Sequence, residues 1–250
     1  MSEQRNTDRT DRTDGRKRTG HGGTGPGPIT PDGCAVDLYR RLAVGTEPEV
    51  IEAALPAGAT LLELGSGAGR VTVPLAERGF AVTAVDESAE MLAVVGERAP
   101  DVETVLSPIE ELRLPRRFDA VVLGSFLVHS ADHRTRQGLL ETCRRHVKDD
   151  GHVLVQREGA DYHDDVPRER HDPAGYTVRI AATDPVGDGV DRVLCEYVFP
   201  DARWTQTFLS RRLTPEAFEG HLAEAGLAVE RYLTDDGTWV LARPVPGVSG

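Results

Sequence analysis

The chain has 250 residues, of which 39% are apolar and 28% charged, and its formal net charge is -12. This length and composition are typical of a globular protein with one large domain or at most two small ones. The acidic balance argues against a nucleic-acid partner, because phosphate binding requires a basic face.

The first thirty residues are mainly Arg, Asp, Thr and Gly. A segment with so few apolar side chains cannot offset its ordering entropy by burial. We therefore predict a disordered tail over residues 1–30, removable without loss of activity, and a folded domain over residues 31–250. The N-terminus lacks the apolar core of a secretion signal, and no stretch approaches the roughly 20 apolar residues of a membrane span. These features predict a cytoplasmic protein without a membrane partner.

Helix and strand patterns alternate from residue 36 onward. Apolar residues at helical spacing predict short helices at 36–42 and 48–55. The alternation then predicts strands at 60–64, 81–85, 102–106, 118–123 and 152–156, with helices at 71–78, 88–99 and 132–147. Alternating strands and helices at this spacing are typical of a parallel α/β sheet.

The alternation stops after residue 157. Residues 158–175 are polar, and period-two runs follow at 176–180, 193–197 and 204–208. We interpret these runs as a small antiparallel sheet inserted over residues 158–210, in which Trp204 and Phe208 belong either to the core or to a substrate surface. A last helix begins near Thr214, and a hairpin with strands at 227–233 and 238–242 ends the fold.

The strongest local motif is Glu63-Leu64-Gly65-Ser66-Gly67-Ala68-Gly69-Arg70, between a strand and a helix. Glycines allow the backbone to approach a ligand, and the helix N-terminus presents amide donors to it. Asp86 ends the next strand, where a carboxylate can accept hydrogen bonds from both hydroxyls of a ribose. The motif therefore predicts a nucleoside-containing cofactor.

Two cofactors fit this outline. The NAD fingerprint is G-x-G-x-x-G, whereas here the third glycine comes one residue early. Glu63, two residues before Gly65, would repel a pyrophosphate but attract the cationic sulfonium and ammonium of S-adenosylmethionine (SAM). The details favour SAM and leave an NAD(P)-dependent oxidoreductase as the alternative.

Four segments together resemble the class I SAM-dependent methyltransferases: residues 62–70, 82–88, 118–122 and 150–151. The resemblance covers about residues 36–243, and within the class it is closest in kind to bacterial small-molecule methyltransferases. It implies a Rossmann-like α/β fold with a seven-stranded sheet, whose last strand is antiparallel and closes a C-terminal hairpin. It also implies that the inserted sheet at 158–210 is a substrate cap.

The resemblance implies cofactor contacts from Tyr39, Glu63, Gly65, Ser66, Gly67, Arg70, Asp86, Glu87, Pro108, Ile109, Glu110, Gly124 and Ser125. By this analogy the glycine loop lines the methionine part of SAM and Asp86 holds the ribose. Family members often have an aspartate in the adenine loop, where this chain has Pro108. The adenine amino group is then left to Glu110 or Glu111.

Methyl transfer is an in-line substitution, so the protein has chiefly to align acceptor and methyl group and exclude water. A general base is needed only where the acceptor must lose a proton early. His129, after the fourth strand, is the best candidate base, the alternative being that it packs or hydrogen-bonds to backbone. Arg157 and Glu158 follow the fifth strand and are candidates for substrate contact, the alternative being solvated loop residues.

The sequence thus predicts methyl transfer from SAM to an oxygen, nitrogen or activated carbon of a small molecule, in bacterial secondary metabolism. A SAM-binding protein without catalysis remains open. The three cysteines show no metal-ligand spacing, and we expect no metal. We expect a monomer or a homodimer.

Overall fold

The computed structural model describes residues 18–247. Its main sheet has seven strands in the order β11-β12-β6-β5-β2-β3-β4. The strands are β2 (Thr60–Leu64), β3 (Ala81–Asp86), β4 (Glu103–Leu106), β5 (Phe118–Leu123), β6 (Val147–Gln156), β11 (Leu227–Tyr232) and β12 (Trp239–Pro244). β12 runs antiparallel to both β6 and β11, and the pairs among β2 to β6 are parallel. The expected α/β fold with a C-terminal antiparallel hairpin is confirmed.

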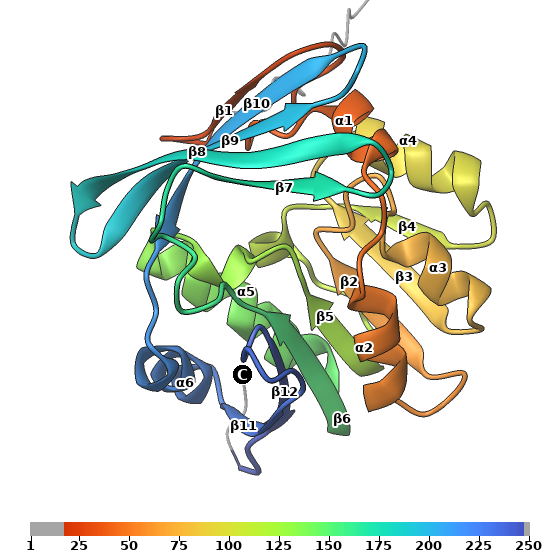
Figure 1. Ribbon diagram of the computed structural model, residues 1–250. Coiled ribbons are helices and arrows are strands. Elements are labelled where there is room, and N and C mark those ends of the chain that lie inside the picture. The colour runs from red at the N-terminus through yellow and green to blue at the C-terminus, as the bar shows by residue number, and fades with distance from the viewer. Residues whose placement is uncertain (1–17, 248–250) are drawn as a thin grey trace, which may run out of the picture.

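Helices cover both faces of this sheet (Figure 1). They are α1 (Val36–Arg41), α2 (Glu47–Ala54), α3 (Thr72–Glu77), α4 (Ala89–Arg98), α5 (His133–His146) and α6 (Pro215–Glu224), with single turns η1 (Ile109–Glu111) and η2 (Leu127–His129). Strand side chains alternate between the two faces, so β5 contributes Val121 to the core under α5 and α6 and Val122 to the core under α2 and α3. Burial on both faces explains why these strands read as continuous apolar runs.

The helix ends are fixed by side chains that the sequence makes visible. Ser88 accepts a hydrogen bond from the Met91 amide at 3.2 Å and caps α4, and Thr214 accepts one from the Ala217 amide at 3.2 Å before α6. Such caps satisfy amides that have no partner within the helix. The predicted starts of these helices are therefore accurate to within a residue or two.

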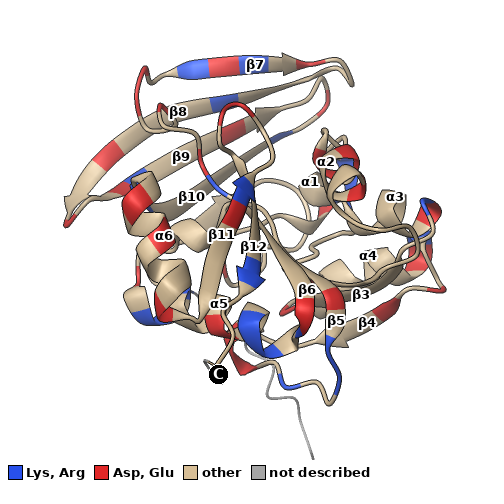
Figure 2. Cartoon of the chain, turned by 90° about the horizontal axis from the view of Figure 1, so that it is seen from below, with Lys and Arg blue, Asp and Glu red and all other residues tan. Residues whose placement is uncertain are grey.

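A second sheet of five antiparallel strands lies over one end of the main sheet (Figure 1). Its order is β1-β10-β9-β8-β7, with β1 (Gly22–Thr24), β7 (Arg168–Asp172), β8 (Tyr176–Gly187), β9 (Val190–Val198) and β10 (Arg203–Arg211). The three period-two runs became β8, β9 and β10. The edge strand β7 was not predicted, because it consists of basic and acidic residues without the alternating apolar residues that mark a strand, as Figure 2 shows.

The prediction of a disordered tail is wrong for residues 18–30, while residues 1–17 lie outside the described residues. β1 pairs with β10, and the Trp204 indole donates to the Pro26 carbonyl at 2.8 Å. This segment is ordered by backbone pairing rather than by burial of its own side chains. Gly23 allows β1 to lie directly against the backbone of Gly33, because a Cβ on Gly23 would come within 2.1 Å of the Gly33 carbonyl oxygen.

Trp204 is buried beside Leu38, so of its two alternatives the core assignment is the one that the structure supports. Phe208 is partly buried and lines a cavity instead. None of the helices within residues 18–247 combines the length and the apolarity that crossing a bilayer requires.

Candidate active site

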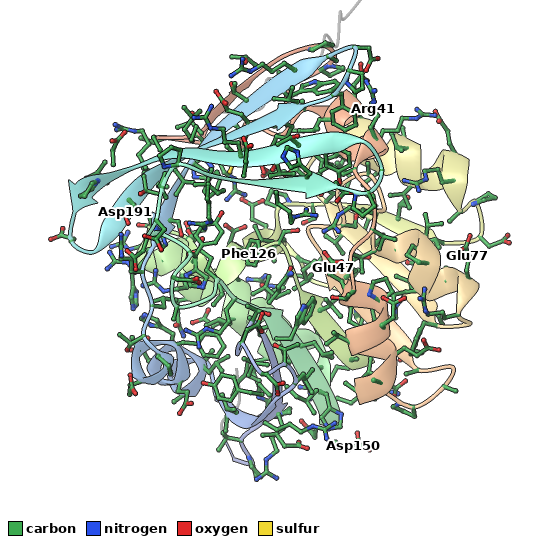
Figure 3. All side chains as sticks on the ribbon, viewed as in Figure 1. Arg41, Glu47, Glu77, Phe126, Asp150 and Asp191 are labelled. Carbon is green, nitrogen blue, oxygen red and sulfur yellow. The ribbon has the colours of Figure 1, made fainter. Side chains whose placement is uncertain are left out.

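A cavity of about 460 Å³ lies between the carboxyl ends of the main-sheet strands and the second sheet. Main-sheet connections contribute Gly65, Asp86 and Ser125, and the second sheet contributes Tyr197 and Phe208. Figure 3 shows that Glu47 and Phe126, which also line the cavity, lie in this region. Ligands of open α/β sheets bind at the carboxyl ends of the strands.

A second cavity of about 470 Å³ lies at the opposite edge of the main sheet. Its walls include Thr60, Ala81 and Phe118, the first residues of β2, β3 and β5. Because it is at the amino ends of the strands and lacks the glycine loop, we assign the site to the first cavity.

The glycine loop follows β2 with three residues in the left-handed region. The φ angles of Gly65, Gly67 and Gly69 are +73°, +54° and +79°, which explains the G-x-G-x-G spacing. A Cβ on Gly65 would also come within 2.8 Å of the Leu127 side chain. The amides of Gly65 and Ser66 both donate to the Val85 carbonyl at 2.9 Å, which ties the loop to β3.

Asp86 lies at the end of β3 and lines the cavity. One of its carboxylate oxygens accepts a hydrogen bond from the Gly67 amide at 2.8 Å, and the other accepts one from the Ser88 amide at 2.9 Å. Burial raises the pKa of Asp86 to about 6. Each oxygen keeps a lone pair for a further donor, as the ribose role requires.

Glu63 and Arg70 occupy different places around the loop. Glu63 is buried behind it, outside the cavity wall, and accepts a hydrogen bond from the Thr72 hydroxyl at 2.5 Å. Burial raises the pKa of Glu63 to about 7. Arg70 lines the cavity and pairs with Glu47 at 2.6 Å.

The expected adenine loop is only partly at the cavity. Ile109 lines it, but Pro108 and Glu110 do not. Pro108 instead precedes the η1 turn, and Glu110 lies 3.6 Å from the Arg18 guanidinium. Ser107 follows β4 and its amide donates to the Asp86 carbonyl, so the loop is held beside β3.

The connection after β5 carries two consecutive strained residues. Ser125 and Phe126 have φ of +52° and +59°, and both line the cavity. The Ser125 amide donates to the Gln156 side chain at 2.8 Å, whereas the Gly124 carbonyl is used by the Leu127 amide and Gly124 is not on the wall. Left-handed non-glycine residues are rare and gather at functional sites.

Part of the site comes from the N-terminal segment, which sequence reasoning missed. Arg18, His21, Asp32 and Cys34 line the cavity. Glu87 lines it too and is paired with Arg18 at 3.0 Å. No apolar pattern marks this segment, so only its glycines offered a signal.

Tyr39 reaches the cavity from α1, as expected of a helix folded over the site. Its hydroxyl donates to the Gln206 side-chain oxygen at 3.2 Å, and the Gln206 amide donates to the Cys34 sulfur at 3.0 Å. The tyrosine thereby joins the main sheet's helix layer to β10.

The assignment of His129 as a base is corrected by its hydrogen bonds. The ring is 3% exposed, and Nδ1 donates to the Arg211 carbonyl at 2.8 Å. Nε2 accepts a hydrogen bond from the Glu158 amide at 3.0 Å. Burial lowers the pKa of His129, which agrees with a neutral ring. His129 lines the cavity and its Nδ1 also lies 3.2 Å from a Glu158 oxygen, but backbone groups occupy both nitrogens, so these contacts favour a positioning role over that of a base.

Arg157 is also placed differently from the prediction. Its guanidinium donates to the Leu213 carbonyl at 2.9 Å and lies over the Phe218 ring, away from the cavity. Arg157 therefore fastens α6 to β6. Glu158 points the other way: it lines the cavity and is 3% exposed, so it is not a solvated loop residue.

Within residues 18–247, one group of side chains has the types and spacing of metal ligands: His133, His221 and Glu224. It lies where α5 meets α6, outside the cavity wall, with His133 exposed.

Comparison with known families and sequences gives a consistent result. A family described as a methyltransferase domain matches residues 61–151. An uncharacterized methyltransferase of Mycobacterium tuberculosis is 41% identical over 94 residues, which cover 37% of this chain and 39% of the relative. A dTDP-3-amino-3,6-dideoxy-alpha-D-glucopyranose N,N-dimethyltransferase of Streptomyces fradiae is 33% identical over 102 residues, 40% of each chain. The matches thus span about two fifths of the length of these curated relatives.

Solved structures are similar over most of the chain. A SAM-dependent methyltransferase from Clostridium acetobutylicum has a TM-score of 0.66 at 16% identity, over 84% of this chain and 97% of that one. A sugar N-methyltransferase from Streptoalloteichus has a TM-score of 0.65 at 21% identity, over 85% of this chain and 93% of that one. At these identities the likeness concerns the fold. The matched methyltransferase domain spans the glycine loop and β2 to β5, and most of the chain shares the fold of the SAM-dependent methyltransferases of known structure.

Proposed function

We propose that this protein transfers the methyl group of SAM to a small-molecule acceptor. The observation that carries the proposal is the placement of the Gly65–Gly67 loop and Asp86 in one cavity that also extends to the second sheet. SAM supplies the activated methyl group, so the chain has to bind, align and exclude water.

The residues of the cavity fit SAM by charge. The wall includes five carboxylates, from Asp32, Glu47, Asp86, Glu87 and Glu158, and three guanidinium groups, from Arg18, Arg70 and Arg170. An excess of carboxylates favours a ligand with a sulfonium and an ammonium, and disfavours the pyrophosphate of NAD. This charge balance supports SAM over the oxidoreductase alternative.

The cofactor roles follow from position. The Gly65 and Gly67 backbone would hold the methionine part, and Asp86 has a free lone pair on each oxygen for the ribose. Ile109 would pack against adenine, and Ser125 would lie at the methionine end. Glu63, behind the loop, would act on the SAM ammonium only through intervening groups.

We assign the acceptor to the side of the cavity formed by residues 158–210. Tyr162, Tyr176, Tyr197 and Phe208 line it, and such side chains bind organic molecules through large apolar faces and a polar edge. A relative named as an amino-sugar N,N-dimethyltransferase, and neighbours named as a sugar N-methyltransferase and an amino pentose methyltransferase of calicheamicin biosynthesis, support a small polar acceptor from secondary metabolism.

Ligand binding tests the first half of the proposal. SAM and its product S-adenosylhomocysteine (SAH) should raise the melting temperature and give a saturable calorimetric signal, while NADH at the same concentration should give neither. If NADH bound and neither SAM nor SAH did, the cofactor assignment would be reversed in favour of NAD(P). Release of SAH with a panel of small acceptors then separates an enzyme from a protein that only binds SAM.

A further inference from the structure

Glu158 is a buried carboxylate where the two sheets meet. It follows β6 by two residues, is 3% exposed, and lines the same cavity as the glycine loop. Burying an ion is costly unless partners compensate it, so the contacts of this carboxylate indicate why the fold keeps it.

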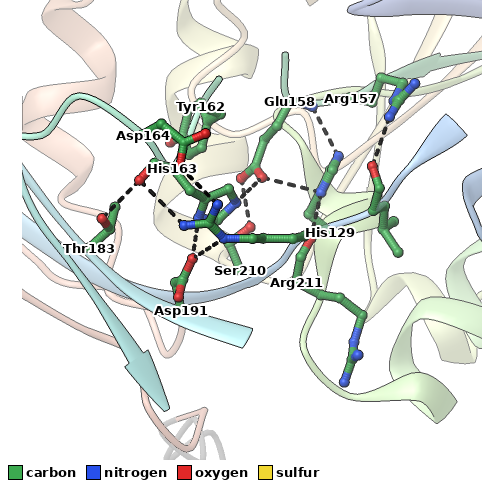
Figure 4. A network of polar contacts seen from close by, with 12 residues as sticks. His129, Arg157, Glu158, Tyr162, His163, Asp164, Thr183, Asp191, Ser210 and Arg211 are labelled. Carbon is green, nitrogen blue, oxygen red and sulfur yellow. Dashed lines mark hydrogen bonds and ion pairs between the residues drawn. The ribbon is translucent and has the colours of Figure 1, made fainter. Parts of the chain in front are cut away.

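Four ionisable groups form a chain from Glu158 to Arg212, and His129 Nδ1 lies 3.2 Å from the Glu158 oxygen at its start (Figure 4). One Glu158 oxygen lies 2.8 Å from His163 Nε2, and His163 Nδ1 lies 2.9 Å from an Asp191 oxygen. Asp191 in turn accepts a hydrogen bond from Arg212 Nε at 2.7 Å. A carboxylate oxygen lies within 3 Å of each ring nitrogen, so His163 bridges Glu158 and Asp191. Arg212 closes the chain at its other end, and these contacts hold the Glu158 carboxylate in place.

The Glu158 carboxylate lines the cavity and can accept a further hydrogen bond. Its Oε1 accepts a hydrogen bond from the Ser210 hydroxyl at 2.7 Å, and a carboxylate oxygen can accept two. Ser210 and Tyr162 line the cavity beside it. A ligand at this end therefore meets a fixed negative charge with a vacant lone pair.

A fixed anion discriminates between acceptors of different charge. An amine attacks with its lone pair: the N–C bond forms, the C–S bond breaks with its electrons kept by sulfur, and the nitrogen becomes R–NH₂⁺–CH₃. Positive charge thus grows on nitrogen during the reaction, and a nearby carboxylate stabilises the transition state more than the ground state. An ionised hydroxyl would instead be repelled by the same carboxylate.

We propose that Glu158 accepts a hydrogen bond from the nitrogen of a primary or secondary amine, and that this carboxylate makes the protein an N-methyltransferase. The inference rests on the proposed function, since the amine has to meet the methyl group of SAM. Ser210 and His163 act as positioning residues for the carboxylate.

Calorimetry with sinefungin and SAH tests this without knowledge of the acceptor. Sinefungin is a SAM analogue with a carbon-bound ammonium in place of the sulfonium and its methyl group, so it places a cation next to where the acceptor nitrogen would lie. Wild-type protein should bind sinefungin at least tenfold more tightly than SAH. Glu158→Gln should abolish that preference and keep SAH affinity within threefold, whereas the exposed control Glu141→Gln should retain it.

The outcomes separate the two proposals. If Glu158→Gln still prefers sinefungin to SAH, or if the wild-type protein shows no such preference, the role of Glu158 is overturned while the assignment of SAM binding stands. Failure of SAM, SAH and sinefungin alike overturns the proposed function itself. If Glu158→Gln does not fold, Glu158→Asp retains the charge one methylene further away, and the preference should fall at least threefold with SAH affinity unchanged. An unchanged preference in this variant likewise contradicts the inference.

Turnover gives a second readout. With 3-amino-3,6-dideoxy-D-glucose and 6-deoxy-D-glucose as probes, which differ only in the amine or hydroxyl at carbon 3, SAH release should be at least a hundredfold faster with the amine. Faster methylation of the hydroxyl compound would overturn the inference.

Discussion

The Arg18 guanidinium binds the Glu87 carboxylate at two points, Nη2 to Oε2 at 3.0 Å and Nε to Oε1 at 3.2 Å, across a separation of 69 residues. This pair fastens the N-terminal segment to the turn after β3, where the adenosine of SAM would bind. Truncation of the N-terminus is therefore expected to affect the cofactor once it reaches residue 18.

Arg18→Ala should weaken SAM binding two- to fivefold, because the segment that it anchors forms part of the cavity wall. In a double-mutant cycle with Glu87→Gln, the coupling in the free energy of unfolding should be about 0.5–1 kcal/mol, since both side chains are partly exposed. Calorimetry and denaturant unfolding measure the two effects. A coupling near zero with unchanged SAM affinity would show that the pair does not hold the segment.

Asp86→Ala should weaken SAM binding by about 1.5–3 kcal/mol, the usual cost of losing charge-assisted hydrogen bonds. The variant also leaves the Gly67 and Ser88 amides without their acceptor, so a moderate loss of stability should accompany it. The exposed Asp101→Ala is the matched control and should keep wild-type affinity. An unchanged dissociation constant for Asp86→Ala would mean that the ribose is held elsewhere.

Glu63 makes stability depend on pH with a defined sign. Burial raises its pKa from 4.5 to about 7, so the folded state favours the protonated form. The stabilisation of the folded state by protonated Glu63 is fully present below pH 4.5 and is lost as the pH rises through about 7. Without ligand, Glu63→Gln should thus be more stable than wild type at pH 8 by up to about 3 kcal/mol, and the two should converge near pH 4. Denaturant unfolding across this range measures the difference; a constant offset would contradict the argument.

His129→Asn separates a structural histidine from a catalytic base. The asparagine amide can still donate to the Arg211 carbonyl, while the Glu158 amide loses its acceptor. Stability should fall by about 1–3 kcal/mol, the cost of an unsatisfied buried donor. Turnover per folded enzyme should stay within tenfold, whereas loss of a general base typically costs a factor of about 10²–10⁴. A loss in that range with stability unchanged would restore the base role.

Phe208→Ala should raise the acceptor KM at least tenfold and keep SAM affinity within threefold, an energy of roughly 0.65 kcal/mol. Phe208 lines the cavity from β10, on the side assigned to the acceptor. Phe118 is the matched control: it is buried in the core under α5 and is not on the wall of this cavity. Phe118→Ala should lower stability and leave the acceptor KM unchanged. Equal effects of the two changes would argue that the second sheet is purely structural.

The main sheet and the cofactor loop could be predicted from the sequence because their signals are local. A strand, a glycine turn and a helix are contiguous, and the positive φ of Gly65, Gly67 and Gly69 requires the residue type that the sequence shows. Asp86 follows from the same unit, one strand later. Alternation of apolar residues identified β8, β9 and β10, since one face of that sheet is buried.

The acceptor side was decided by tertiary structure, because its contacts join residues far apart in the chain. Ser210 reaches Glu158 across 52 residues, and the Arg211 carbonyl fixes His129 across 82. A sequence pattern places such residues on elements but does not say which side chain turns toward the cavity, so Arg157 and Glu158 looked equivalent. Residues 18–30 were misjudged for a related reason: backbone pairing with β10 orders them, and backbone hydrogen bonds leave no apolar pattern in the sequence.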